Sequence, residues 1–146
     1  MVAFSTSTSQ ILRWRHMRKM KKTPDVNRGF ITIDKLGGEV GLQQVEHDPS
    51  DTPLEGADDP RSHNAFTSPD GKYTANVWAC NAGTLKIDNL AISEACFLLE
   101  GNVELTDLEG NKAVYGPGDA FLLPKGFCGY WHMPEPILKY NTMYEG

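Results

Sequence analysis

The 146-residue chain predicts an all-β barrel or sandwich, and three observations support that fold class. Two short apolar runs, Cys96–Leu99 and Ala120–Leu123, each end at a turn. Turn signals at Leu108–Asn111 and Gly116–Asp119 separate the runs, so the predicted strands recur about every 8–12 residues, as in small β domains. The chain has 14 glycines and 9 prolines, and those between the runs exclude a helix across the gaps.

Residues 1–22 differ in composition from the remainder of the chain. They begin with a Ser/Thr-rich run and carry six basic side chains and no acidic one. Such a composition is typical of an organelle-targeting segment, but it also fits a simple tail or a start upstream of Met17 or Met20. We therefore assign the folded domain to residues 23–146. We expect a cytoplasmic protein, with organelle targeting through residues 1–22 as the alternative.

The first part of the folded domain holds one expected strand and one long polar segment. Gly29–Asp34 reads as an edge strand because apolar residues follow a glycine. Val45–Pro69 is rich in Asp and Pro, and long segments of this kind usually form surface loops. We expect it to be a surface arm, a lid or an exchange element of a dimer, with its acidic residues in solvent.

The second part contains the clearest strand signals. Lys72–Gly83 alternates between two side-chain sets with a period of two, which indicates a strand. Thr84–Ile87 begins the next strand, and Pro136–Tyr144 reads as the last one. The total of about eight strands is enough for a small closed barrel or jelly roll.

Charge and composition exclude several classes of function. Outside residues 1–22 the chain holds 8 basic and 19 acidic residues, so this part lacks the basic surface that phosphate contacts need, and we expect no nucleic-acid partner. No apolar run approaches the roughly 18 residues of a membrane span, and we expect no membrane partner. The three cysteines lack a CxxC spacing and fit free thiols in a reducing compartment.

Two motifs carry a family resemblance. Glu94 precedes Gly101 by the E-x6-G spacing of the first cupin motif, and Gly118, Pro124 and Gly126 match the G-x5-P-x-G of the second. The chain resembles the small single-domain cupins grouped with the C-terminal domain of ureidoglycine aminohydrolase and with the ethanolamine-utilisation cupin. The resemblance implies a single-domain cupin β-barrel, or jelly roll, whose core spans about residues 73–144.

The resemblance also shows which residues are missing. Metal-dependent cupins hold their ion with two His and one Glu from the first motif and one His from the second. Here only Glu94 remains: Ile87–Leu90 contains no His, and Gly129 stands at the second-motif His position. One carboxylate does not bind a transition metal selectively. We therefore predict no metal and no other cofactor, with a site built on His132 as the remaining alternative.

Strand alternation predicts what the barrel encloses. If Glu94 points inward as in the related cupins, Cys96 does too, and Trp131 shares the inward parity of position 129. His132 then faces away unless a bulge intervenes. We take Glu94, Cys96, Trp131 and His132 as candidate ligand-binding residues. Glu94 is also the catalytic candidate, because a buried carboxylate without a partner has a raised pKa and can act as a general acid.

The same residues could also have purely structural roles. Glu94 can accept hydrogen bonds from the barrel backbone, and Cys96 and Trp131 can be core residues. Three functions follow: a metal-free barrel that binds a small metabolite, a C–N hydrolase similar to ureidoglycine aminohydrolase with Glu94 as acid and base, or an accessory subunit of a metabolic assembly. We expect a small-molecule ligand and, from the resemblance, a homodimer.

Overall fold

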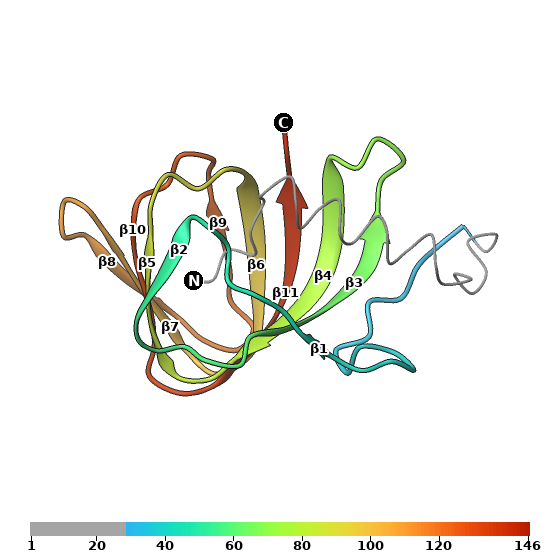
Figure 1. The fold of residues 1–146 in the computed structure, drawn as a ribbon, viewed down its shortest axis with the longest axis horizontal. Helices are drawn as coiled ribbons and strands as arrows, with labels where there is room; N and C mark the ends of the chain where they lie inside the picture. The colour runs from blue at the N-terminus through green and yellow to red at the C-terminus, as the bar shows by residue number, and fades with distance from the viewer. Residues whose placement is uncertain (1–28) are drawn as a thin grey trace.

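The computed structural model describes residues 29–146 as two antiparallel β-sheets that face each other across a common interior (Figure 1). One sheet has six strands in the order β1-β3-β4-β11-β6-β9, and the other has five in the order β2-β5-β10-β7-β8. The strands are β1 Gln43–Gln44, β2 Asp51–Gly56, β3 Arg61–Thr67, β4 Tyr73–Cys80, β5 Gly83–Ile87, β6 Ser93–Glu100, β7 Val103–Asp107, β8 Lys112–Tyr115, β9 Ala120–Leu123, β10 Gly129–Met133 and β11 Ile137–Tyr144.

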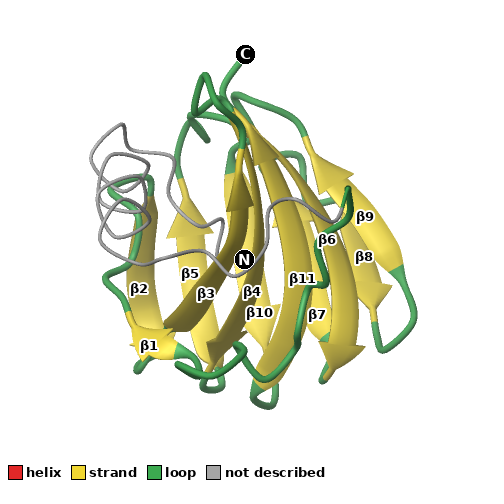
Figure 2. Cartoon of the chain, turned by 90° about the vertical axis from the view of Figure 1, so that its right-hand side faces the viewer, coloured by secondary structure: helices red, strands yellow, loops and turns green. Residues whose placement is uncertain are grey.

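The interior is apolar and receives side chains from both sheets. Trp78 on β4 and Leu98 on β6 come from the six-stranded sheet, while Leu85 on β5 and Trp131 on β10 come from the other. Figure 2 shows the strands curving around this space. The arrangement confirms the predicted all-β jelly roll. Residues 29–146 contain no helix long and apolar enough to cross a lipid bilayer.

Several predicted elements are confirmed. Both apolar runs are strands, within β6 and as β9, and the alternating segment and the C-terminal segment form β4 and β11. The turn before β9 is closed by Asp119, whose carboxylate accepts a hydrogen bond from the backbone N–H of Gly116 at 2.9 Å. This local bond explains why a Gly-x-Gly-Asp sequence follows β8.

Two predictions for the first part of the domain are wrong. Gly29–Asp34 is not a strand, and Phe30 is 73% exposed, because the segment pairs with no strand among residues 29–146. Val45–Pro69 is not an arm but contributes β2 to one sheet and β3 to the other. Its polar composition misled the prediction because β2 exposes most of its side chains and β3 is built mainly from half-buried polar residues. The proposed tail at residues 1–22 lies outside the described residues.

The central strand β11 sets up the interior. It pairs with β4 on one side and β6 on the other, and the pairing with β6 shifts register between Leu138 and Lys139. Residues Lys139, Asn141 and Met143 all lie inside and are at most 2% exposed. A lysine and an asparagine therefore lie within the barrel, and on the neighbouring strand β6 Asn141 is paired with Cys96 and Lys139 with Leu98.

Candidate functional site

Glu94 is the centre of a fully buried polar cluster. Its Oε2 atom accepts hydrogen bonds from Lys139 Nζ at 2.7 Å, Cys96 Sγ at 3.0 Å and Asn141 Nδ2 at 3.3 Å. All four residues are 0% exposed. The prediction that Glu94 and Cys96 point inward together is confirmed. Glu94 has a cationic partner and two further donors, so in this arrangement it acts as a hydrogen-bond acceptor and counter-ion.

Lys139 lies between two indole rings that come from opposite sheets. Its Nζ atom is 4.8 Å from the centroid of the Trp78 ring and 4.6 Å from that of the Trp131 ring. Both distances are within the range of a cation–π interaction, which is stronger where water is excluded. The ion pair with Glu94 and the two rings together compensate for the removal of the ammonium group from water.

Cys96 is a protonated thiol in this environment. Burial, followed by the nearby negative charge of Glu94, raises the pKa of the Cys96 thiol well above its usual range. The thiol therefore donates its hydrogen to the carboxylate, and its sulfur also lies 3.6 Å from Lys139 Nζ. A neutral, buried thiol is a poor nucleophile, so the position does not suit thiolate catalysis.

A second acid, Asp51 at the start of β2, is buried and interacts electrostatically with the cluster. Burial is the main cause that raises the pKa of Asp51 well above its usual 3.8, and the charges of Asp48 and Glu94 act in the same direction, while Lys139 opposes them. The raised pKa favours the neutral acid. The interior thus combines one charged pair with one carboxyl group that tends to keep its proton.

Several polar atoms of this interior have no hydrogen-bond partner among the residues that the structure describes. They are Glu94 Oε1, Asn141 Oδ1, Trp131 Nε1 and Asp51 Oδ2. Native proteins satisfy nearly all buried polar atoms with protein, water or ligand, so such a concentration needs an explanation. Both hydrogen-bond acceptors and a donor are present, because the indole nitrogen donates only.

The residues around Glu94 do not fit the metal ion of metal-dependent cupins. Among residues 29–146, no group of three or more His, Cys, Asp or Glu is arranged to hold a metal. The Glu94 oxygen that a cation would approach already accepts a bond from the Lys139 ammonium, and imidazole donors are missing from the cluster. The positive charge next to Glu94 therefore comes from the Lys139 side chain, in the place where a metal ion would lie.

Gly129 leaves no room for the missing histidine. A Cβ atom built at this position would lie 2.3 Å from the backbone oxygen of Thr106 and 2.8 Å from the Phe127 ring. The glycine therefore opens no space for a ligand, because a neighbouring backbone and the Phe127 side chain occupy that space. The glycine is needed for close packing of β10 against β7.

The two candidate residues on β10, Trp131 and His132, point to opposite faces of the sheet because they are adjacent in the strand. Trp131 points inward and is 0% exposed. His132 lies on the outer face, where its Nδ1 atom is 2.7 Å from Thr84 Oγ1 and its Nε2 atom is 3.6 Å from Glu104. The structure thus brings together Glu94, Cys96 and Trp131, and it places His132 on the opposite face of the same sheet.

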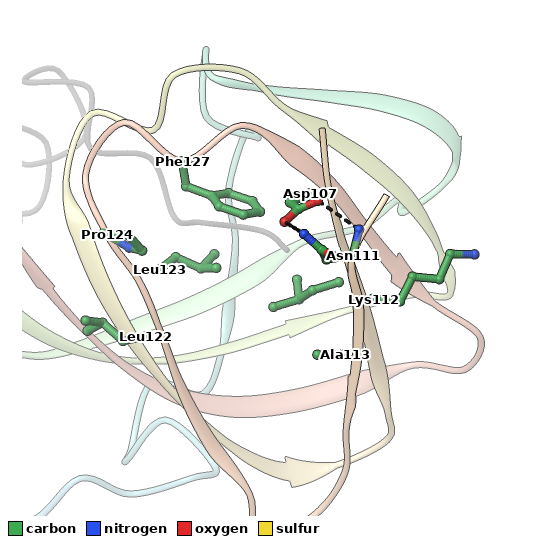
Figure 3. A pocket seen from close by; sticks show the side chains of 9 residues that line it. Asp107, Asn111, Lys112, Ala113, Leu122, Leu123, Pro124 and Phe127 are labelled. Atoms are coloured by element: carbon green, nitrogen blue, oxygen red, sulfur yellow. Dashed lines mark hydrogen bonds between the residues drawn. The ribbon is translucent and has the colours of Figure 1, made fainter. Parts of the chain in front are cut away.

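A shallow surface hollow of about 270 Å³ lies next to the β7–β8 hairpin (Figure 3). Its apolar side includes Leu122, Leu123 and Phe127, and its polar side is the Asp107 carboxylate, to which Asn111 donates at 2.8 Å. None of the candidate site residues lines it. The hollow is therefore a separate feature from the buried cluster.

Two residues of the cluster, and the nearby acid Asp51, were missed from the sequence. Lys139 and Asn141 are in the β11 segment read only as a strand, and Asp51 is in the segment read as a solvated arm. The available signal was a single lysine between apolar residues in Ile137–Tyr144, which is unusual for a central strand. For Asp51 no signal was present, since acids surround it on both sides.

Comparisons with known proteins bear on the fold and the family. Solved structures that resemble the chain include an ethanolamine utilization protein Q from Salmonella typhimurium LT2 (18% identity, 80% of this chain and 98% of that chain, TM-score 0.53). A DUF861 family protein of unknown function from Pseudomonas syringae (20% identity, 76% and 46%, TM-score 0.60) and the Clostridium difficile EutQ protein (15% identity, 58% and 67%, TM-score 0.51) are also similar. At these identities the likeness shows the fold alone.

No curated protein is significantly similar to the chain. The family model for the EutQ-like cupin domain, however, matches residues 67–140, which is just over half of the chain. The matched range includes β4, the Glu94 strand β6, the Trp131 strand β10 and the start of β11 with Lys139. The chain belongs to the family of EutQ-like cupin domains.

Proposed function

We propose that this chain is a metal-independent cupin that binds a small polar metabolite inside the barrel, beside the Glu94–Lys139 pair. The observation that carries the proposal is the group of buried polar atoms around that pair that no described residue satisfies, namely Glu94 Oε1, Asn141 Oδ1 and Trp131 Nε1. They converge on one region, because Asn141 and Lys139 both bond Glu94 and the Trp131 ring packs on Lys139.

The chemistry of these atoms narrows the ligand. Two acceptors and one donor complement a molecule that carries at least one N–H or O–H group and at least one acceptor oxygen or nitrogen. The Lys139 ammonium supplies the positive charge that a metal ion supplies in metal-dependent cupins, since it lies 2.7 Å from Glu94. The ligand is small, because the large side chains of Trp78 and Trp131 share the same interior.

An aromatic row leads from the cluster towards the surface. The Trp131 ring lies 5.7 Å from the Phe121 ring, which stacks at 4.4 Å on Tyr115. Phe121 and Tyr115 are half-buried and come from β9 and β8, the edge strands on this side of the two sheets. We propose that a ligand reaches the interior between β8 and β9, after the side chains of Tyr115 and Phe121 move aside.

A thermal-shift screen of small polar metabolites tests this function. A true ligand stabilises the folded protein by mass action and so raises Tm. At a ligand concentration of a hundred times Kd, the free energy of unfolding rises by about 2.7 kcal/mol. Trp131→Phe keeps an aromatic ring but removes the unsatisfied N–H, so the shift should shrink. Tyr130→Phe, on the outer face of the same strand, is the matched control. No stabilising metabolite, or an equal shift in Trp131→Phe, would contradict the proposal.

The proposal includes a homodimer and a cytoplasmic location. Free edges support the first, since β8 and β9 each pair on one side only within residues 29–146. The second rests on three free cysteines, Cys80, Cys96 and Cys128, which fit a reducing compartment. Light scattering of the purified full chain checks the dimer, and a single-chain mass would refute it.

A further inference from the structure

A lysine, a cysteine and a glutamate meet at one point inside the barrel. The Lys139 Nζ and Cys96 Sγ atoms are 3.6 Å apart, and both donate to the same oxygen of Glu94, at 2.7 Å and 3.0 Å. The amine and the thiol belong to adjacent, paired strands, so the backbone holds them at this separation. The proposed metabolite site rests on Glu94 Oε1, Asn141 Oδ1 and Trp131 Nε1, and it does not use the contact between the thiol and the amine.

We propose that Cys96 and Lys139 form a covalent N–O–S bridge when the reduced protein meets dioxygen, and that the cluster is a site of oxidative modification. In this reaction the ammonium of Lys139, the thiol of Cys96, the carboxylate of Glu94 and one dioxygen molecule give a neutral –NH–O–S– link, a protonated Glu94 carboxyl and one water molecule. The sulfur and the nitrogen each lose two electrons, and dioxygen gains four. One oxygen atom enters the bridge and the other leaves as water.

The surroundings suit this chemistry. The proton that the ammonium must release has an acceptor 2.7 Å away, the Glu94 carboxylate. The first oxidation of a cysteine places one oxygen atom on its sulfur, and here the Lys139 amine lies 3.6 Å from that sulfur. The same residues are 0% exposed, so bulk water and bulky reductants do not intercept the oxidised sulfur. Dioxygen is small and apolar enough to enter a protein interior.

The bridge would change the charge of the site. In the reduced state the interior holds one cation and one anion, and Lys139 contacts both indole rings. In the bridged state both charges are gone, and Glu94 loses the thiol donor of Cys96, while the bridge nitrogen of Lys139 keeps one N–H. The cation–π contacts disappear with the ammonium. Oxidation would therefore convert a charged interior into a neutral one without moving any strand.

Mass spectrometry of the full-length protein tests the inference. Protein purified under reductant without oxygen is compared with protein exposed to air. In air, the intact mass should rise by one oxygen atom less two hydrogens, and trypsin should no longer cleave after Lys139. The peptide that contains Lys139 should then be joined to the one that contains Cys96, and dithiothreitol should separate them.

Matched variants make the test specific. Cys96→Ser retains a hydrogen-bond donor to Glu94 and should lose the cross-link completely. Cys80→Ser, at another buried cysteine on β4, should retain it. An air-exposed protein with an unchanged mass overturns the inference. So does a gain of oxygen on Cys96 without the link to Lys139, or a direct sulfur–nitrogen link that lacks the oxygen. Because this readout needs no metabolite, its failure is distinguishable from failure of the proposed ligand binding.

Discussion

The Nζ atom of Lys139 lies 2.7 Å from Oε2 of Glu94, and neither side chain is exposed to solvent. Burying two charges is favourable only when they are well paired and hydrogen-bonded. Here the pair is supported by Cys96, by Asn141 and by the rings of Trp78 and Trp131. This arrangement leads to measurable consequences for stability, reactivity and metal binding.

Removing one member of the buried pair should destabilise the protein strongly. Lys139→Met leaves the Glu94 carboxylate without its cation, and Glu94→Gln leaves the ammonium without its anion. We expect each to lower the free energy of unfolding by about 3–5 kcal/mol, and the double variant to lose less than the sum. Urea unfolding curves measure all three.

The exposed pair Arg61–Asp59 is the control for this double-mutant cycle. Its atoms are 3.0 Å apart, but both side chains are more than one third exposed. Arg61→Ala should therefore cost about 0–1 kcal/mol. Equal costs at the buried and the exposed pair would show that Lys139 and Glu94 are not a structural unit.

The three cysteines should differ sharply in reactivity. Burial raises the pKa of Cys80 to about 12 and raises that of Cys96 as well, whereas Cys128 is half-buried at the barrel end. In reduced native protein, a thiol-specific aromatic disulfide reagent should titrate Cys128 at least ~10²-fold faster than the other two. Cys128→Ser should remove the fast phase. A fast phase that persists in Cys128→Ser would place a reactive thiol in the interior.

Asp51 should make stability fall as the pH rises. Because burial raises its folded-state pKa above the usual 3.8, the folded protein holds this proton more tightly than the unfolded chain. The stability that Asp51 contributes is fully present when the pH is below the unfolded-state pKa of about 3.8. It is lost as the pH rises through the folded-state pKa. Asp51→Asn cannot titrate, so the wild type should weaken relative to it by up to about 1.4 kcal/mol per pH unit.

Asp107 provides the opposite control. Hydrogen bonds from the side chain and backbone of Asn111 lower the pKa of this exposed carboxyl. Its contribution should be present above the unfolded-state pKa and should be lost as the pH falls through the folded-state pKa. The free energies of unfolding of the two variants should therefore change relative to wild type in opposite directions with pH. The advantage of wild type over Asp51→Asn should shrink as the pH rises, and its advantage over Asp107→Asn should shrink as the pH falls. A pH-independent difference for Asp51→Asn would contradict the assignment.

Gly129→Ala should destabilise the barrel by about 1–3 kcal/mol, because the added Cβ meets the backbone of Thr106. Gly116→Ala is the control, since its Cβ approaches only the movable side-chain amide of Asn102. Thermal unfolding of both variants measures the difference. If Gly129→Ala is as stable as wild type, the close packing of β10 on β7 is not what requires the glycine.

The sequence was sufficient for much of the fold and for half of the cluster. Strand alternation from Glu94 correctly placed Cys96 inside, and alternation from Gly129 did the same for Trp131. These predictions succeeded because β6 and β10 each expose one face and bury the other, so a single anchor residue fixes the parity.

Lys139 was missed for a physical reason. In Ile137–Tyr144 both sets of alternate residues contain large apolar side chains, so parity does not tell which set is inside. The set with Leu138 and Tyr140 looks more like a core face than the set with Lys139 and Asn141. Lys139 shares its side-chain parity with Asn141 and Met143, and only the pairing of β11 between β4 and β6 shows that this set faces the interior.

The strands β2 and β3 were missed for a different reason. Strand signals in a sequence come mainly from apolar alternation, and these strands instead bury polar residues such as Asp51 and Ser62. Long-range pairing with β5 and β4, rather than local preference, makes them strands.

The metal content of the purified full-length protein tests the central claim, that Lys139 supplies the cation of this site, most directly. Elemental analysis after incubation with Mn, Fe, Ni or Zn and desalting should find no stoichiometric metal in wild type, and the same in Glu94→Gln. One equivalent of metal per chain in wild type that is lost in Glu94→Gln would contradict the account, because Glu94 would then be a metal ligand rather than the partner of Lys139.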